Sequence, residues 1–136
     1  MDDLRRFLDA QAPIYTRVLQ ELAAGEKRSH WMWFVFPQLR GLGSSAMAQR
    51  YGLAGRAEGE AYVRHSILCP RLVECTRLVL AVRGKTALDI FGYPDDLKFP
   101  SSMTLFASVA ADPEPFRGAL DKYFAGVSDP RTLALL

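Results

Sequence analysis

The feature that most constrains the fold is a dense apolar block inside the stretch SHWMWFVFPQLRGLGSS, which runs from Ser29 to Ser45. Every residue from Trp31 to Phe36 is apolar, both tryptophans of the chain lie in this block, and Pro37 ends it. Basic residues precede the block, and a turn rich in glycine and serine follows it. A block of this kind is typical either of the protein core or of the wall of a site whose rim carries positive charge and hydrogen-bond donors.

Apolar residues recur at helical spacing through much of the remaining chain. An apolar face with i, i+4 and i+8 spacing occupies residues 14–22, and Gly25 follows it as a stop signal. The aromatic and β-branched content of the apolar block also suits a buried strand, but no convincing partner strand is present elsewhere. We therefore predict one or two helical turns that begin at a Ser29 cap and end before Pro37. The fold class that follows is mainly α, a compact single domain over residues 1–136 with several short to medium helices.

Prolines, glycines and capping residues divide the chain into short segments. A first helix is expected to be capped by Asp2 or Asp3, and a second begins or bends at Pro13. A short helix from Ser44 or Ser45 to Tyr51 and a helix over 56–65 follow, and then a central helix runs from Pro70 to a stop at Gly84. Thr86 is expected to cap a short segment, and the last helices begin at Asp112–Pro113 and Asp129–Pro130. The segment GYPDDLKFP, residues 92–100, is predicted to be a loop because it contains a glycine and two prolines. Because proline disfavours helical geometry at the residue before it, the next helix is predicted to begin at Ser101 or Ser102 and to run through Val109.

Length and charge restrict the classes of function. A chain of 136 residues can bury a core without disulfides or metal, and a net charge of +2 with scattered arginines gives no strong nucleic-acid signal. No apolar run reaches the ~18 residues of a membrane helix, and the start MDDLRRFLDA is unlike a signal peptide, so a cytoplasmic location is expected. Cys69 and Cys75 fall on different faces of a helix and are predicted to be buried thiols rather than a disulfide. On the same helix, Glu74 is predicted to form ion pairs with Arg71 and Arg77.

The segment KFPSSMTLF, Lys98 to Phe106, is the first candidate for chemistry. A helix that begins after Pro100 would place free backbone N–H groups beside three hydroxyl side chains, with the Lys98 ammonium near them, and such an arrangement binds phosphate. The three hydroxyl residues are Ser101, Ser102 and Thr104. Helix capping beside a solvated lysine explains the same residues and is their more frequent use. The RGLGSS turn at 40–45 has the same two interpretations, and it lacks the length and the lysine of a nucleotide P-loop.

The titratable residues form no metal or cofactor motif. His30, next to the apolar block, is either a titrating site residue or a half-buried histidine bonded to a backbone carbonyl. His65 has no set of partners at the spacing of metal ligands. Asp95 and Asp96 are weak candidates for a general base or for binding ribose hydroxyls, and stabilising a turn is the more frequent role of such residues.

These blocks, together with EAYVRHSILCPRLVECT, IFGYPDDLKFPSSMTLF and KYFAGVSDPRTLALL, resemble the domain-of-unknown-function family numbered 1810, some members of which are labelled calpastatin-like. The resemblance spans nearly the whole chain, and SHWMWFVFPQ and SSMTLF are its most specific parts. It implies a mainly helical fold and brings no established activity. The family's motif residues correspond here to Lys27, Ser29, His30, Trp31, Trp33, Phe36, Pro37, Gln38, Gly41, Gly43, Tyr62, His65, Lys98, Ser101, Ser102 and Thr104. A weaker similarity in size and helicity to NADAR-type domains implies, by analogy alone, N-glycosidic cleavage of phosphorylated ribosyl compounds.

Two hypotheses about function follow. In the first, a pocket binds a small phosphorylated, nucleotide-like ligand without metal or cofactor and, as an enzyme, hydrolyses a glycosidic or related bond with His30, Asp95 or Asp96 as candidate catalytic residues. The aromatic wall would consist of Trp31, Trp33 and Phe36, with Gln38 beside it, and the anion would be held by Lys27, His30, Lys98, Ser101, Ser102 and Thr104. In the second, the chain is a non-enzymatic helical interaction module. A concave pocket lined by Trp31, His30 and Lys98 favours the first, whereas burial of both tryptophans with Lys98 far from His30 favours the second.

Overall fold

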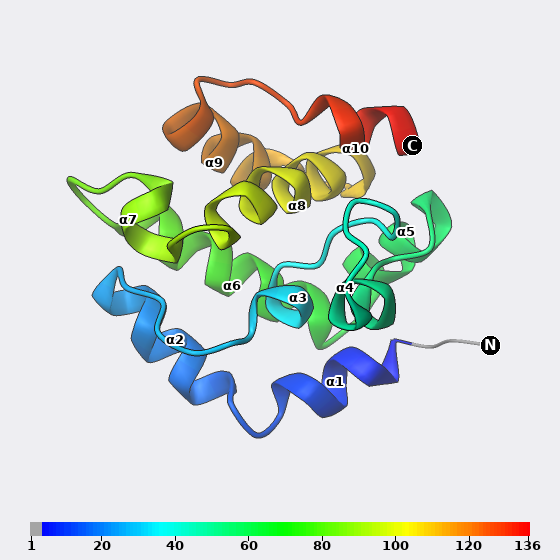
Figure 1. Cartoon of the computed structure of the whole chain (residues 1–136), viewed down its shortest axis with the longest axis horizontal. Helices are drawn as coiled ribbons and strands as arrows, with labels where there is room; N and C mark the ends of the chain where they lie inside the picture. Colours follow the sequence, from blue (N-terminus) through cyan, green and yellow to red (C-terminus); the bar gives the residue numbers. More distant parts are fainter. Residues whose placement is uncertain (1–3) are drawn as a thin grey trace.

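A computed structural model describes residues 4–136, and this part of the chain contains ten α-helices and no strand longer than a single bridge between Leu39 and Leu53. The helices are α1 (Arg5–Gln11), α2 (Tyr15–Ala24), α3 (Met32–Val35), α4 (Ala46–Tyr51), α5 (Arg56–Arg64), α6 (Leu68–Ala81), α7 (Ala87–Phe91), α8 (Asp95–Val109), α9 (Glu114–Phe124) and α10 (Pro130–Leu135). Figure 1 shows them gathered around one interior. The predicted mainly α, compact single-domain fold is confirmed.

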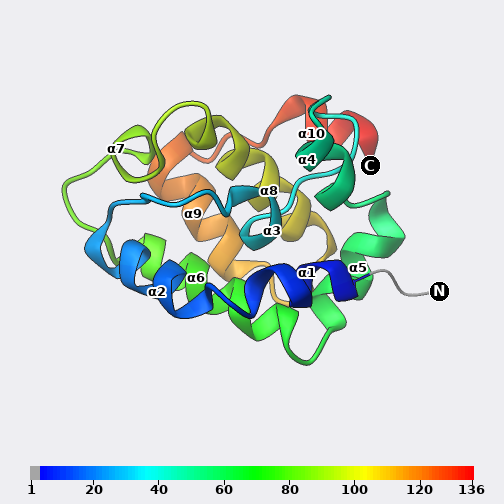
Figure 2. The same ribbon diagram turned by 60° about the horizontal axis from the view of Figure 1, so that its bottom comes forward.

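Two long helices organise the packing. Helix α8 packs against α5, α7, α9 and α10, and α6 packs against α2, α5 and α9. Helix α3, which comes from the apolar block, contacts α1 and α4. Figure 2 shows α1 and α2 following one another along one side of the molecule, with α3 next to α1. The short α3 is thereby placed between the N-terminal helices and the rest of the core.

Aromatic rings from distant helices build the centre of the core. Phe36 and Phe99 have ring centroids 5.0 Å apart in an edge-to-face arrangement, and Tyr62 and Phe106 are 5.3 Å apart. Such ring pairs add a favourable electrostatic contribution to the burial of their apolar area. Trp31 and Phe36 are fully buried, so this part of the apolar block is core.

Local capping signals set most helix boundaries as predicted. Ser45 accepts a hydrogen bond from a backbone N–H in the first turn of α4, and Asp129 does the same for α10. Thr86 and the third residue of α7 form a reciprocal capping box. Gly25 ends α2 in the left-handed conformation at φ 70°, where a side chain would be strained. Pro13 lies in a turn, so α1 and α2 are separate helices.

Other boundaries differ slightly from the prediction. Helix α6 begins two residues before Pro70 and ends at Ala81, ahead of Gly84. The predicted cap at Asp2 or Asp3 lies outside the described residues.

The prediction that Ser29 caps the helix of the apolar block is wrong. Helix α3 is a single turn, and the residue that precedes it is Trp31, which makes no side-chain cap. The Ser29 hydroxyl instead donates a hydrogen bond to the Glu21 carboxylate at 2.6 Å. The segment before α3 is therefore held by a tertiary contact with α2 rather than by a local helix cap.

The predicted loop over residues 92–100 is also wrong beyond Pro94. Helix α8 begins at Asp95 and contains Pro100, which lacks the N–H that would complete one helical hydrogen bond. Two features offset that cost of about 3 kcal/mol. Acidic Asp95 and Asp96 in the first turn face the positive end of the helix dipole, and Phe99 is fully buried, a contribution of about 1.5–3 kcal/mol. The tertiary burial of Phe99 thus extends the helix through a proline.

Helix α6 carries both cysteines. Cys75 is buried as predicted and Cys69 is half-buried, and both are free thiols. The predicted ion pairs of Glu74 are absent, because its carboxylate accepts the Tyr15 hydroxyl at 2.6 Å and Arg71 stacks over the Tyr15 ring. Neither α6 nor any other helix in residues 4–136 has the length and apolarity needed to cross a membrane.

Candidate functional site

A buried carboxylate on α2 holds the residues that lead into α3. Glu21 is 8% exposed, and its two oxygens accept four hydrogen bonds. The donors are the backbone N–H of Arg28 at 2.8 Å, the backbone N–H and hydroxyl of Ser29 at 3.1 and 2.6 Å, and the indole N–H of Trp31 at 2.8 Å. Burial alone would raise the pKa of Glu21, but these donors lower it to about 2. Glu21 therefore acts as an ionised anchor for the basic segment of the site.

Three charged side chains meet where this segment approaches the start of α8. The Asp95 carboxylate lies 2.7 Å from the Lys27 ammonium and 3.3 Å from the Lys98 ammonium. Lys27 also donates to the Ser29 carbonyl at 2.5 Å, and its side chain is 6% exposed. We call Lys27, Asp95 and Lys98 the Asp95 cluster. It joins two regions that the sequence analysis treated as separate candidates.

Each lysine of the Asp95 cluster lies over a tryptophan ring. The Lys27 ammonium is 4.9 Å from the centre of the Trp31 ring, and the Lys98 ammonium is 4.5 Å from the centre of the Trp33 ring. A cation is attracted to the negative face of an aromatic ring at these distances. The two tryptophans nevertheless differ, because Trp31 is fully buried and Trp33 is half-buried. Trp33 is the tryptophan that a ligand can reach.

The Asp95 cluster forms one wall of a hollow of about 330 Å³, which we call the His30 hollow. It is lined by Lys27, Arg28, Ser29, His30, Trp33, Phe91, Tyr93, Pro94, Asp95 and Lys98. Tyr93 is 77% exposed at its edge, an unusual position for a large aromatic side chain. His30 and Lys98 line the same hollow, as the first hypothesis expects, but Trp31, the third residue that it places there, does not.

A second hollow of about 520 Å³, the Ser45 hollow, shares Trp33, Pro94 and Lys98 with the first. Its other lining residues are Gln38, Leu42, Gly43, Ser44, Ser45, Ala48, Leu97, Pro100, Ser101, Asp129 and Arg131. The RGLGSS turn and the start of the SSMTLF block thus meet across one hollow. The two predicted phosphate-binding segments are neighbours in space, and Gln38 lines the same hollow.

Four of the predicted ligand-binding residues are buried and line neither hollow. Trp31, Phe36, Ser102 and Thr104 have exposed fractions of 1% or less. The Thr104 hydroxyl accepts the backbone N–H of Asp129 at 2.8 Å, and the Ser102 hydroxyl has no hydrogen-bond partner in the described part of the chain. Because α8 begins at Asp95, these hydroxyls lie inside the helix and not at a free N-terminus. The prediction that a helix begins at Ser101 or Ser102 and offers a free N-terminus for phosphate is therefore wrong.

The remaining acidic and hydroxyl candidates have structural contacts. Ser101 lines the Ser45 hollow, but its hydroxyl donates to the Asp129 carboxylate at 3.0 Å. Asp96 lines neither hollow, and its Oδ1 is buried without a hydrogen-bond partner in residues 4–136. His65 has a structural role at the start of α6. Its Nδ1 accepts hydrogen bonds from the backbone N–H groups of Ile67 and Leu68. Among residues 4–136, no three His, Cys, Asp or Glu side chains are grouped so as to hold a metal ion.

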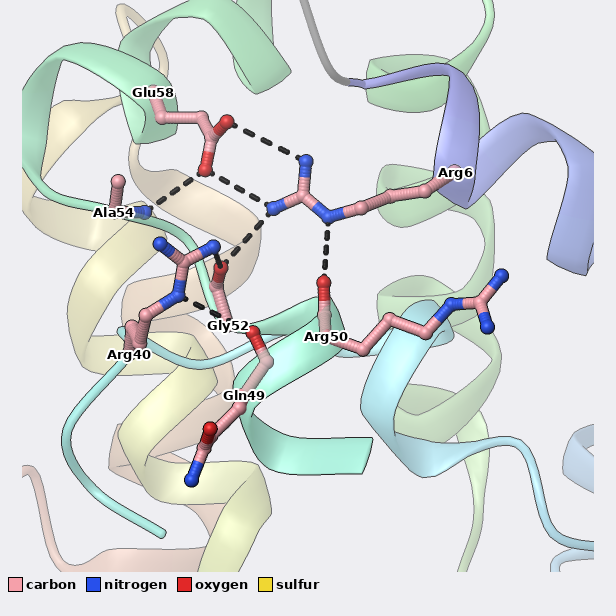
Figure 3. Close-up of polar contacts among 7 residues, drawn as sticks. All are labelled: Arg6, Arg40, Gln49, Arg50, Gly52, Ala54 and Glu58. Atoms are coloured by element: carbon pink, nitrogen blue, oxygen red, sulfur yellow. Dashed lines mark hydrogen bonds and ion pairs between the residues drawn. The ribbon is translucent and has the colours of Figure 1, made fainter. Parts of the chain in front are cut away.

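A network of charged residues, which the sequence analysis missed, fixes the chain on either side of α4 (Figure 3). Arg6 on α1 makes a two-pronged contact with Glu58 on α5 at 3.1 and 3.4 Å and donates to the carbonyls of Arg50 and Gly52. Arg40 donates to the same Gly52 carbonyl at 3.1 Å. These residues are far apart in the sequence, so no local pattern predicts their contact. The network holds the two ends of the segment that lines the Ser45 hollow.

Gly52 is required at the centre of this network by close packing. A Cβ atom there would lie 2.7 Å from the Ala48 carbonyl oxygen and 2.8 Å from the Arg40 Cα. Both distances are shorter than any ordinary contact, and both partners are backbone atoms that cannot move aside cheaply. Arg40 and Leu53 also pair through backbone atoms, with the Arg40 N–H 2.8 Å from the Leu53 carbonyl oxygen.

Comparison with known proteins agrees with this architecture. The crystal structure of the conserved hypothetical protein Rv1873 from Mycobacterium tuberculosis superimposes with a TM-score of 0.98, is 57% identical in sequence, and is matched over 99% of this chain and 96% of its own. No curated protein matches the chain. The family profile described as "Protein of unknown function (DUF1810)" matches residues 1–136. On this match over its whole length, the chain belongs to the DUF1810 family of proteins of unknown function.

Proposed function

We propose that the His30 and Ser45 hollows together form one site for a small phosphorylated ligand that carries a planar ring. The observation that carries this proposal is their shared wall, in which the Lys98 ammonium and the half-buried Trp33 ring face both hollows. Their volumes of about 330 and 520 Å³ lie in the range of small-molecule sites. A cation beside an accessible aromatic ring suits a ligand with an anionic group next to a planar one.

The lining residues divide into two kinds. On the side of the His30 hollow, Trp33 and Tyr93 offer ring faces, while Lys98, Arg28 and His30 offer positive charge or hydrogen-bond donors. On the side of the Ser45 hollow, the hydroxyl and amide groups suit the hydroxyls of a sugar. These groups are Gln38, Ser44, Ser45 and Ser101. Burial of both tryptophans with Lys98 far from His30 would favour the alternative function, a helical interaction module without a small-molecule site. Trp31 is indeed buried, but Trp33 is half-buried and lines one hollow with Lys98 and His30.

We infer that the reaction class of this site is hydrolysis of a glycosidic bond. Asp95 is the best placed of the candidate acids, because it lines the His30 hollow, whereas its pairing with two lysines holds it in place and does not strengthen it as a base. The water oxygen would form the new bond to the anomeric carbon while the glycosidic bond breaks. The Asp95 carboxylate would accept the proton of that water, the leaving group would depart with a proton from solvent, and Lys98 would stabilise the phosphorylated group. Asp96 is a poorer candidate because it lines neither hollow.

Thermal-shift and calorimetric titrations with ADP-ribose, NAD, ribose 5-phosphate and inorganic phosphate test the proposal. We expect at least one of these compounds to stabilise the protein and Lys98→Met to weaken its binding by about tenfold or more, since a hydrogen bond to a charged group contributes about 1.5–3 kcal/mol. Arg83→Met is the matched control, because Arg83 is an exposed cation that lines neither hollow. If none of the four compounds binds the folded protein at millimolar concentration, the proposed site is refuted.

A further inference from the structure

The outer face of α6 carries an apolar hollow that the proposed site does not use. The inner side of this helix is buried against its neighbours, with Leu72, Cys75 and Val79 fully or nearly fully covered. The outer side carries an open hollow of about 650 Å³ lined by Cys69, Pro70, Val73, Glu74, Arg77 and Leu78. Apolar surface of this kind on a soluble protein marks a contact surface more often than chance.

Two opposite charges lie at the centre of this face and do not pair with each other. The Glu74 carboxylate accepts the Tyr15 hydroxyl through Oε1. The guanidinium of Arg77 is exposed, and it makes no hydrogen bond or ion pair with any residue from 4 to 136. A carboxylate has about four acceptor positions, so Glu74 can accept a further donor without losing Tyr15.

The face is symmetric about its own midpoint, which lies between Cys75 and Thr76. Glu74 and Arg77 are equally distant from that point along the helix, and so are Val73 and Leu78. If two copies of α6 pack antiparallel about a two-fold axis through the midpoint, each Glu74 faces the Arg77 of the other copy. Glu74 and Arg77 lie within one helical turn of the axis, so this pairing fits a shallow antiparallel crossing of about 20°.

We propose that this outer face of α6 binds the same face of a second copy of the chain. The occupant is identified by charge self-complementarity: two Glu74–Arg77 ion pairs form at once beside apolar surface, as a two-fold interface requires. A single helix of 14 residues spans about 21 Å, so the buried area falls below the standard interface size. The dimer is therefore weak, with an expected Kd of about 0.1–1 mM.

Sedimentation equilibrium of the wild type and of charge-reversed variants tests the proposal. The protein concentration runs from about 10 μM to about 1 mM, the range in which such a small interface assembles. The wild type is expected to rise from the 15.2 kDa monomer towards twice that mass. Glu74→Arg and Arg77→Glu each place like charges opposite one another twice, so each variant alone is expected to associate at least about tenfold more weakly. An equimolar mixture of the two variants restores both attractive pairs and is expected to dimerise at least as well as the wild type. Circular dichroism confirms that each variant is folded.

A matched pair of variants on α9 controls for general charge attraction between the mixed proteins. Glu114 and Arg117 are exposed and have the same spacing as Glu74 and Arg77, so Glu114→Arg and Arg117→Glu change the net charge equally. We expect these variants to dimerise like the wild type, alone and mixed. A wild type that stays monomeric to about 1 mM refutes the proposal. So does a dimer that Arg77→Glu leaves intact, or a mixture of the α6 variants that associates no better than the mixture of the α9 variants.

Discussion

Replacing Glu21 by glutamine tests the role of the buried carboxylate that holds the segment before α3. The pKa of this carboxyl lies at about 2, against an ordinary value of 4.5. A tenfold change in the acid constant corresponds to about 1.4 kcal/mol, so the ionised form of Glu21 contributes about 3 kcal/mol to stability at neutral pH. Glutamine keeps the shape but turns an N–H donor towards the four donors that surround Glu21. We expect a loss of about 3 kcal/mol at pH 7 and, for a domain of 136 residues, a fall in Tm of about 10 °C.

The pH dependence distinguishes this effect from a loss of packing. Because the pKa of Glu21 is lowered in the folded state, its contribution is complete above about pH 5 and is lost as the pH falls towards 2. The difference between wild type and Glu21→Gln, measured by urea unfolding with tryptophan fluorescence, should halve to about 1.5 kcal/mol at pH 3. Glu26→Gln is the control, because Glu26 forms an exposed pair with Arg28 and such pairs contribute under about 1 kcal/mol. A loss that is equal at pH 7 and pH 3, or smaller than about 1 kcal/mol at pH 7, would contradict the reasoning.

Three further predictions concern groups that only the structure brings to notice. Gly52→Ala places a Cβ 2.7 Å from a backbone carbonyl oxygen and should cost about 1–3 kcal/mol in urea unfolding, whereas Gly55→Ala, which meets nothing within 4 Å, should change stability by less than about 1 kcal/mol. Ser102→Ala removes a buried hydroxyl without a partner in the described chain, so Tm should stay the same or rise; a fall of several degrees would indicate a partner. Burial raises the pKa of the Cys75 thiol to about 12. A thiol reagent should therefore modify the half-buried Cys69 of the native protein first and Cys75 only after unfolding. Equal rates of modification of the two thiols in the native protein would contradict this prediction.

Local signals in the sequence predicted most of the secondary structure. The apolar spacing of residues 14–22 and the stop at Gly25 gave the right position for α2. The cap at Thr86 was right to the residue, and Ser45 is one of the two caps expected for α4. These signals succeed because capping and amphipathic spacing act between residues no more than a few positions apart. The start of α8 was predicted wrongly because the burial of Phe99, a contact with distant residues, outweighs the local effect of Pro100.

The candidate site was predicted in part. Lys27, His30, Trp33, Gln38, Lys98 and Ser101 line the two hollows as expected, and Asp95 joins them as the acid of the Asp95 cluster. The choice between Trp31 and Trp33 was beyond the sequence, because both are tryptophans of one apolar block, two positions apart. Glu21 decides it by binding the indole N–H of Trp31 and drawing that ring inside, which leaves Trp33 beside Lys98.

The sequence by itself determined that this chain is helical, where most of its helices begin and end, and which family it belongs to. These properties depend on the order and spacing of neighbouring residues, which the sequence states directly. The tertiary structure alone decided that Lys27 and Lys98 share Asp95, that Arg6 binds Glu58, and that the hydroxyls at 102 and 104 belong to the core. Burial and ion pairing join residues that are distant along the chain, so they exist only once the helices have packed.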